Sequence, residues 1–283
     1  MITTSDIAQA VETQLQTIAS ELRPDILEAL YRARQSESGS SATRILDMII
    51  ENAARAVETG VPLCQDTGTV RILIELGAQV PADLRGLQAA LDTVVQRSSA
   101  VQGFRASTVR DAFADRSNPG TNTPAFIEIT QSLNLETTVH TMLKGGGTDN
   151  ASTVTMLTPN STAGDIEQLV LDTVLEKASQ ACPPLIIGIG IGGTFDTVAS
   201  LSKKALLRPL NTPATTKQAA VLEERLLKAI NVTQIGPAAL GGDTTALAVQ
   251  IETAPSHIAS LPLAINLCCH SLRSSTQKII ASN

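Results

Sequence analysis

The residues best suited to chemistry stand together in one short stretch, Pro62-Leu-Cys-Gln-Asp-Thr-Gly68. Four consecutive positions in it carry a thiol, an amide, a carboxylate and a hydroxyl. A helix-like segment (residues 41–60) precedes the stretch and a strand-like one (69–76) follows it, so rigid elements would hold both of its ends. We expect either a loop whose side chains converge on a ligand or a capped turn around a buried thiol.

The other cysteines, Cys182, Cys268 and Cys269, are far from Cys64 along the chain, and no two form a CxxC pair. Zinc-ribbon and thioredoxin-type sites are therefore unsupported. Widely spaced cysteines can each supply one thiolate to an iron–sulfur cluster, because the ligands need to converge only in space. Three thiolates on a four-iron cluster would leave one iron open to a substrate oxygen. The alternative is that all four are ordinary buried thiols.

Two glycine-rich segments could also hold a ligand. Lys144-Gly-Gly-Gly-Thr-Asp-Asn150 could expose backbone N–H groups as an anion nest, or it could be a flexible hairpin tip with Lys144 as a solvated charge. Gly188, Gly190 and Gly193 spell G-x-G-x-x-G in a buried strand-like run. The dinucleotide fingerprint also needs an acidic residue about 20 residues further on. Lysines and an arginine stand there instead, so nucleotide binding is the weaker alternative.

Composition narrows the class of protein. The 283 residues carry a net charge of −6, with 43% hydrophobic and 17% charged residues, which suffices for a core and is too apolar for disorder. Aromatic residues make up only 2% and no basic run is present, so the sequence does not support nucleic-acid binding. It shows no secretory signal and no apolar stretch long enough to span a bilayer. We therefore expect a cytoplasmic protein without membrane contact.

Hydrophobic periodicity places the secondary structure. It predicts helices over residues 4–60 (with breaks), 82–100, 164–181 and 215–231, and strands over 69–76, 125–132, 136–143, 185–193 and 246–252. The long connection 103–124 is punctuated rather than low in complexity, so we expect an ordered loop. These elements predict an α/β protein with one large mixed domain over residues 1–283. An N-terminal helical region would precede β-sheet segments that carry the cysteine and glycine loops.

Four segments, taken in order, resemble the α-subunit family of the class I, iron–sulfur-dependent fumarate hydratases and L-tartrate dehydratases. They are Pro62-Leu-Cys-Gln-Asp-Thr-Gly68, Leu143-Lys-Gly-Gly-Gly147, Gly188-Ile-Gly-Ile-Gly-Gly-Thr-Phe195, and His257-Ile-Ala-Ser-Leu-Pro followed by Cys268-Cys-His270. The resemblance covers about residues 5–275. It implies a 4Fe–4S cluster with Cys64, Cys182 and Cys269 as ligands. Cys269 is preferred to Cys268 because the family pattern places this ligand twelve residues after the histidine.

The same resemblance assigns the surroundings of the substrate. Asp66 would take part in proton transfer, and His257 would lie at the substrate as a second catalytic residue. The implied substrate contacts are Gln65, Arg105, Gly145, Gly146 and Gly147, with the arginine on one carboxylate and glycine N–H groups on the other. Two positions depart from the family pattern: Asp243 stands where a lysine is expected, and Ser117–Pro124 only approximates Asn-Thr-Gly-x-Asn-Thr-Pro.

The implied function is the reversible hydration of fumarate to L-malate, a small dicarboxylate reaction. The chain would need a separate β subunit, in a heterotetramer of two α and two β chains. L-tartrate and mesaconate-type substrates are alternatives within the family. A non-catalytic iron–sulfur binding or sensing module is the alternative from another class of protein. Of the histidines outside the proposed catalytic set, His140 is expected to be structural and His270 to form a local hydrogen bond.

Overall fold

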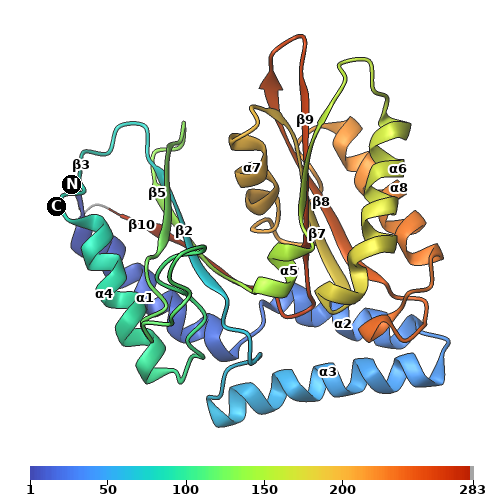
Figure 1. Cartoon of the computed structure of the whole chain (residues 1–283), viewed down its shortest axis with the longest axis horizontal. Helices are drawn as coiled ribbons and strands as arrows, with labels where there is room; N and C mark the ends of the chain where they lie inside the picture. Colours follow the sequence, from blue (N-terminus) through green and yellow to red (C-terminus); the bar gives the residue numbers. More distant parts are fainter. Residues whose placement is uncertain (281–283) are drawn as a thin grey trace. The chain divides into compact units, whose positions relative to one another are not determined.

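The computed structural model describes residues 1–280, which form two compact units. Unit 1 consists of Met1–Arg23, Asn52–Gly146 and the C-terminal segment from Leu272, and unit 2 of Pro24–Glu51 and Gly147–Ser271. Each unit has its own four-stranded sheet with helices packed on it (Figure 1). The predicted α/β class is confirmed, while the single domain over residues 1–283 stays a prediction.

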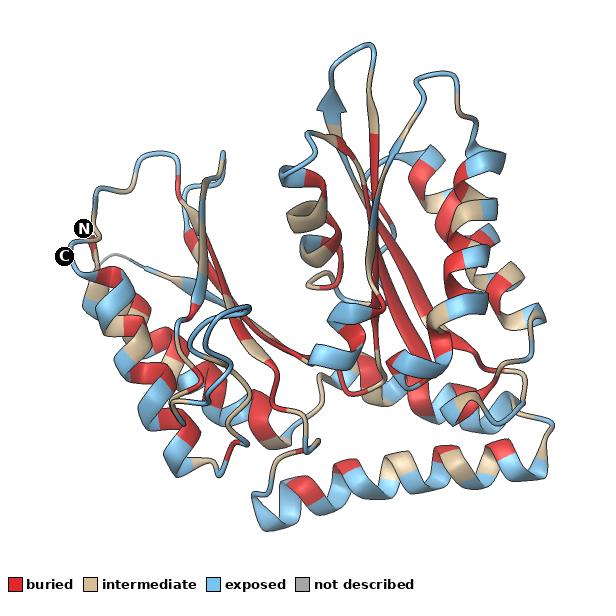
Figure 2. Cartoon of the chain, viewed as in Figure 1, coloured by how far each residue is buried: buried red, intermediate tan, exposed pale blue. Residues whose placement is uncertain are grey.

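Unit 1 is built on a mixed sheet in the order β10-β5-β2-β4. Its strands are β10 (Arg273–Ile279), β5 (Thr137–Lys144), β2 (Thr69–Leu76) and β4 (Phe126–Gln131), and a small parallel pair joins β1 (Ile2–Thr3) to β3 (Ala82–Asp83). Helices α1 (Thr4–Ser20) and α4 (Leu87–Val101) bury their apolar faces against the sheet (Figure 2). Thr3 begins α1 with a capping box to Asp6, which satisfies backbone N–H groups of the first turn.

Unit 2 is built on a sheet in the order β6-β9-β7-β8. Its strands are β6 (Thr153–Leu157), β9 (Leu261–Cys268), β7 (Leu185–Gly193) and β8 (Ala246–Ser256). One aliphatic core joins β7, β8 and β9 to α6 (Ala163–Lys177) and α8 (Lys217–Val232), and α7 (Thr197–Ala205) packs on the opposite face. The remaining elements are α2 (Pro24–Ser36), α5 (Gly146–Asn150), the 3-10 turns Ala178–Ala181 and Pro237–Ala239, and α3 (Ser40–Thr59), which runs from unit 2 into unit 1.

The G-x-G-x-x-G segment lies within β7 rather than in a strand-to-helix turn. A Cβ atom on Gly188 would lie 2.2 Å from the backbone oxygen of Ser202, and one on Gly190 would lie 2.5 Å from that of Val198. Both partners belong to α7, so these glycines allow this helix to approach the strand closely. Helix packing therefore accounts for the motif, and nothing in its geometry favours a nucleotide.

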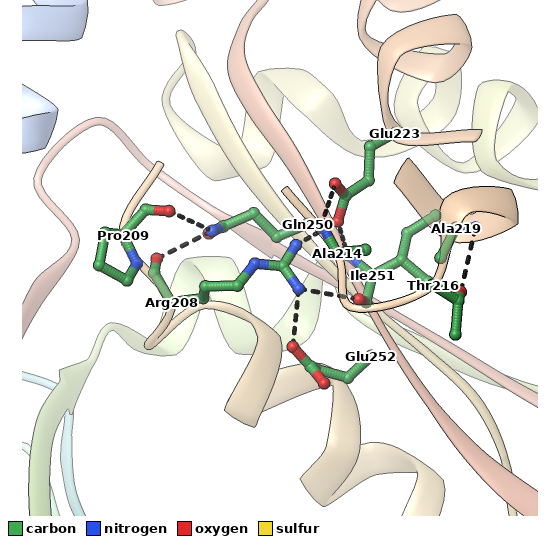
Figure 3. A network of polar contacts seen from close by, with 9 residues as sticks. All are labelled: Arg208, Pro209, Ala214, Thr216, Ala219, Glu223, Gln250, Ile251 and Glu252. Atoms are coloured by element: carbon green, nitrogen blue, oxygen red, sulfur yellow. Dashed lines mark hydrogen bonds and ion pairs between the residues drawn. The ribbon is translucent and has the colours of Figure 1, made fainter. Parts of the chain in front are cut away.

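A network of charged and polar side chains covers the outer edge of β8, which ends the unit 2 sheet on one side. Glu223 on α8 accepts a hydrogen bond from the backbone N–H of Ile251 at 2.6 Å, and Arg208 donates to the carbonyl of Ile251 at 3.0 Å (Figure 3). Arg208 also pairs with Glu223 and with Glu252. Because these side chains form hydrogen bonds with the backbone N–H and carbonyl of Ile251, those groups are not open to a strand of another chain.

Within residues 1–280, no helix is both long and apolar enough to cross a membrane.

Candidate active site

The Cys64–Thr67 turn of unit 1 is anchored at both ends. At its start, the N–H of Leu63 donates to the carbonyl of Ala19 at 2.9 Å, and Asn52 donates to the Leu63 carbonyl at 3.0 Å. At its end, Gly68 has φ +76°, and a Cβ atom there would lie 2.0 Å from the backbone oxygen of Lys144. Only glycine fits so close an approach in this conformation. The two ends of the turn are therefore fixed in position, and its side chains project from a defined backbone.

The side chains of this turn differ in exposure. Gln65 is exposed, Cys64 and Asp66 are half-buried, and Thr67 is buried with no hydrogen-bond partner for its hydroxyl among the described residues. Beneath the turn, Arg273 donates from Nη2 to the backbone oxygen of Asp66 at 2.7 Å. Sequence reasoning missed Arg273, because it begins a polar strand whose pattern gives no sign of burial.

The glycine segment 145–147 joins β5, which ends at Lys144, to α5, which begins at Gly146. A strand-to-helix turn replaces the hairpin tip that was considered as an alternative. Lys144 is only 1% exposed, so its description as a solvated charge is wrong. A Cβ atom on Gly146 would lie 4.0 Å from Oδ2 of Asp66, which places the glycine turn of unit 1 beside this carboxylate. Gly147 belongs to unit 2, where the Gln180 carbonyl approaches it.

Arg105 lies in the long loop of unit 1, and its side chain is exposed. The loop is ordered, as predicted, because buried Asn122 bridges it. Asn122 donates to the carbonyl of Arg105 at 3.2 Å and accepts from the N–H of Ser107 at 2.6 Å. The guanidinium of Arg105 has no hydrogen-bond or ion-pair partner among residues 1–280, so it is available to an anionic ligand. The departure of Ser117–Pro124 from the family pattern leaves this bridging asparagine in place.

Two of the three predicted cluster ligands lie at the same end of the two central strands of the unit 2 sheet. Cys182 stands just before β7 and Cys269 just after β9, and these strands are antiparallel with Ile186 opposite Cys268. Nδ1 of His270 lies 3.2 Å from the carbonyl oxygen of Cys182, which ties the two segments together. This contact bears out the local hydrogen bond expected for His270.

The two neighbouring cysteines, Cys268 and Cys269, differ in their surroundings. Cys268 is 3% exposed within β9, whereas Cys269 is half-buried beyond the end of the strand, with Sγ 3.1 Å from Oγ of Ser271. Cys182 is exposed and has φ +52°, a conformation that is uncommon for a residue with a side chain and that recurs at functional sites. The geometry therefore suits Cys269 better than Cys268 as a ligand.

The cysteines offer a donor set of the kind that the implied 4Fe–4S cluster requires. None of the four cysteines forms a disulfide. Cys182 is an exposed thiol and Cys269 a half-buried one at the same end of the unit 2 sheet, and Cys64 is a half-buried thiol on the anchored turn of unit 1. Thiolates are the ligands that iron–sulfur clusters use, so the residues fit in their chemistry. Across the described part of the chain, no three His, Cys, Asp or Glu side chains form a preassembled metal site.

His257 lies away from these cysteines within unit 2. It occupies the hairpin between β8 and β9, next to Ser256, which pairs with Gly193 at the far end of β7. The whole of β9 separates this hairpin from Cys269, and at about 3.3 Å per residue the strand is more than 20 Å long. A small dicarboxylate could not contact both residues of one chain. The twelve-residue spacing gave no hint of this separation, because those residues include a complete strand.

Two residues outside the predicted site have clear structural roles. His140 on β5 bonds through Nε2 to Glu75 at 3.0 Å and through Nδ1 to Thr276 at 2.8 Å, which confirms that it is structural. Asp243 accepts from the hydroxyl of Ser38 at 2.5 Å and from its N–H at 3.0 Å. The carboxylate in place of the expected lysine therefore joins the glycine-rich turn of unit 2 to the connection between α2 and α3.

The chain is similar in sequence to a family of known enzymes. The family model described as fumarate hydratase (fumerase) matches residues 8–278. A Methanocaldococcus jannaschii protein named "Putative L(+)-tartrate dehydratase subunit alpha" is 36% identical over 283 residues, covering 96% of this chain and 97% of that protein. The L(+)-tartrate dehydratase subunit alpha of Escherichia coli K12 is 28% identical over 263 residues, covering 92% and 86%. These matches confirm the resemblance drawn from the four motifs: the chain belongs to the fumarate hydratase family of hydro-lyases.

Proposed function

We propose that this chain is the α subunit of a 4Fe–4S hydro-lyase that hydrates fumarate to L-malate reversibly. The observation that carries the proposal is the meeting of Cys182 and Cys269 at one edge of unit 2, tied by the His270 hydrogen bond. We propose Cys64 as the third ligand, since it stands on an anchored turn beside Asp66. A cytoplasmic location, where thiols stay reduced, suits such a set.

When bound, the cluster would supply an open iron that acts as a Lewis acid on the substrate hydroxyl. The residues of the chain would hold the substrate and move the proton. Asp66 would exchange the carbon-bound proton next to the reacting hydroxyl. Arg105 would grip one carboxylate as a charge-assisted pair, and the N–H groups of Gly145–Gly147 would donate to the other. Gln65, exposed beside Asp66, would contact the substrate as well.

We propose His257 as a second catalytic residue. Its catalytic role is proposed from the family resemblance alone, and within one chain it lies a strand's length from Cys269. If it acts at the substrate, it must do so from a second chain of the assembly. A β subunit, in a heterotetramer of two α and two β chains, would supply further cationic groups, so the α chain alone should be inactive.

L(+)-tartrate is the second candidate substrate, because the names of the relatives favour it. Mesaconate is a third, and the proposed donor set would serve all three reactions. The test is an anaerobic assay of the chain purified with its partner subunit, given fumarate, L-malate, L(+)-tartrate and mesaconate in turn. Consumption of fumarate with kcat/KM above that for the others supports the proposal. Turnover of L(+)-tartrate alone would replace fumarate as the substrate, and no turnover of any diacid would refute the hydro-lyase assignment.

A further inference from the structure

Arg273 is a buried cation whose side chain donates a hydrogen bond to the backbone of the proposed catalytic residue. The side chain is 3% exposed, and Nη2 donates to the carbonyl oxygen of Asp66 at 2.7 Å. We propose that Arg273 is the positioning residue of the active site: it holds the Cys64–Thr67 turn so that the Asp66 carboxylate faces the glycine turn. This inference rests on the proposed function, in which Asp66 moves the proton.

The surroundings of Arg273 argue against a role in stability alone. It is the first residue of β10 and pairs with Leu143 of β5, itself 2% exposed. A guanidinium taken out of water is costly unless its donors are satisfied, and apolar residues of the same size often serve stability better. Yet Nε of Arg273 is buried without a hydrogen-bond partner within residues 1–280. A buried cation with incomplete bonding is expected where geometry matters more than stability.

The turn depends on this one bond. Leu63 and Gly68 fix its two ends, but between them the Arg273 bond to Asp66 is the one hydrogen bond made by a backbone group of residues 64–67 in the described structure. Without it, the carbonyl of Asp66 could rotate, and the carboxylate on the same residue would turn with it. The carboxylate would then no longer face Gly146, where an added Cβ would lie 4.0 Å from Oδ2 of Asp66.

The first test uses the α chain without a cluster, so that it does not depend on activity. Arg273→Met removes the donors and keeps an apolar chain of similar length. Arg71→Met is the matched control, since Arg71 lies on β2 of the same unit and pairs with Glu128 rather than with the turn. In Arg273→Met, the mean NMR order parameter of the backbone amides of residues 64–67 should fall from about 0.85, typical of rigid backbone, toward about 0.6, because the hydrogen bond that holds the Asp66 carbonyl is lost. In the control it should stay as in the wild type.

The second test separates positioning from substrate binding. In the assembled hydro-lyase, Arg273→Met should lower kcat about 100-fold with KM changed less than about twofold, as expected when a reacting group is displaced by about 1 Å. Arg105→Met should instead raise KM. A raised KM with unchanged kcat in Arg273→Met would overturn the proposal and make Arg273 a substrate ligand. Unchanged order parameters in the turn would overturn it as well.

Arg273→Lys keeps the buried charge with a shorter reach and carries the test if Arg273→Met does not fold. It should restrain the turn less than the wild type does, and wild-type order parameters together with wild-type kcat would overturn the proposal. The two hypotheses fail separately. An inactive wild-type assembly refutes the proposed function, while the NMR measurement on the α chain still decides whether Arg273 holds the turn.

Discussion

Gly188→Ala tests why a glycine motif stands in the middle of β7. The added Cβ would lie 2.2 Å from the backbone oxygen of Ser202, which is 1.2 Å short of the 3.4 Å at which ordinary contact begins. The obstacle is backbone rather than a flexible side chain, so α7 must move away from the sheet by about that distance. Overpacking of this kind costs about 1–3 kcal/mol, and we expect the upper part of that range.

The assay is urea unfolding of the wild type and the variant, monitored by a spectroscopic signal from unit 2. A loss of about 2–3 kcal/mol lowers the midpoint by about 1 M at a typical dependence on urea. Gly164→Ala is the matched control, because a Cβ there lies 3.5 Å from Oγ1 of Thr162 within helix α6 and should be neutral or slightly stabilising. A Gly188→Ala variant as stable as the wild type would refute the packing argument, as would saturable NAD binding that this substitution abolishes.

Three further predictions concern catalysis and pH. Asp66→Asn should lower kcat about 100- to 10,000-fold with iron content unchanged, and full activity would end the proton-transfer role. His257→Asn and Asp66→Asn, each impaired alone, should regain part of the activity when co-assembled, and no recovery would contradict action of His257 from a second chain. The hydroxyl and N–H of Ser38 donate to Asp243 and hold the pKa of its carboxyl below the usual 3.8. These hydrogen bonds therefore stabilise the fold fully above pH 3.8, and this stability is lost as the pH falls through the lowered pKa. Asp243→Asn should therefore flatten the acid side of the stability–pH curve, and an unchanged curve would contradict this.

Much of the fold could be predicted because its signals are local. The predicted strand 69–76 matches β2, the N-terminal helical region contains α1, α2 and α3, and the helix expected at 215–231 is α8 with ends shifted by one or two residues. β10 was missed because Arg-Ser-Ser-Thr-Gln-Lys-Ile lacks an alternating apolar pattern, and pairing with β5 creates this strand. The division into two compact units likewise depends on contacts between distant parts of the sequence, since each unit combines separate stretches of the chain.

The candidate site, too, could be predicted from the sequence only in part. The thiol, carboxylate and glycines were identifiable by residue type and by the family motifs, whereas their spatial grouping depends on strand direction. Cys182 and Cys269 meet because β7 and β9 are antiparallel, and the same β9 carries His257 away. Arg273 and the linking role of Asp243 depend on contacts between residues more than 200 positions apart, which no local pattern encodes.

The cluster and its ligands are the central claim, and anaerobic reconstitution tests them most directly. The chain with its partner would be supplied with iron and sulfide, and iron would be counted beside visible and paramagnetic resonance spectra. We expect four irons per α chain, lost in Cys64→Ser, Cys182→Ser and Cys269→Ser and retained in Cys268→Ser. An assembly that takes up no cluster, or one that loses it only when Cys268 is replaced, would contradict the account.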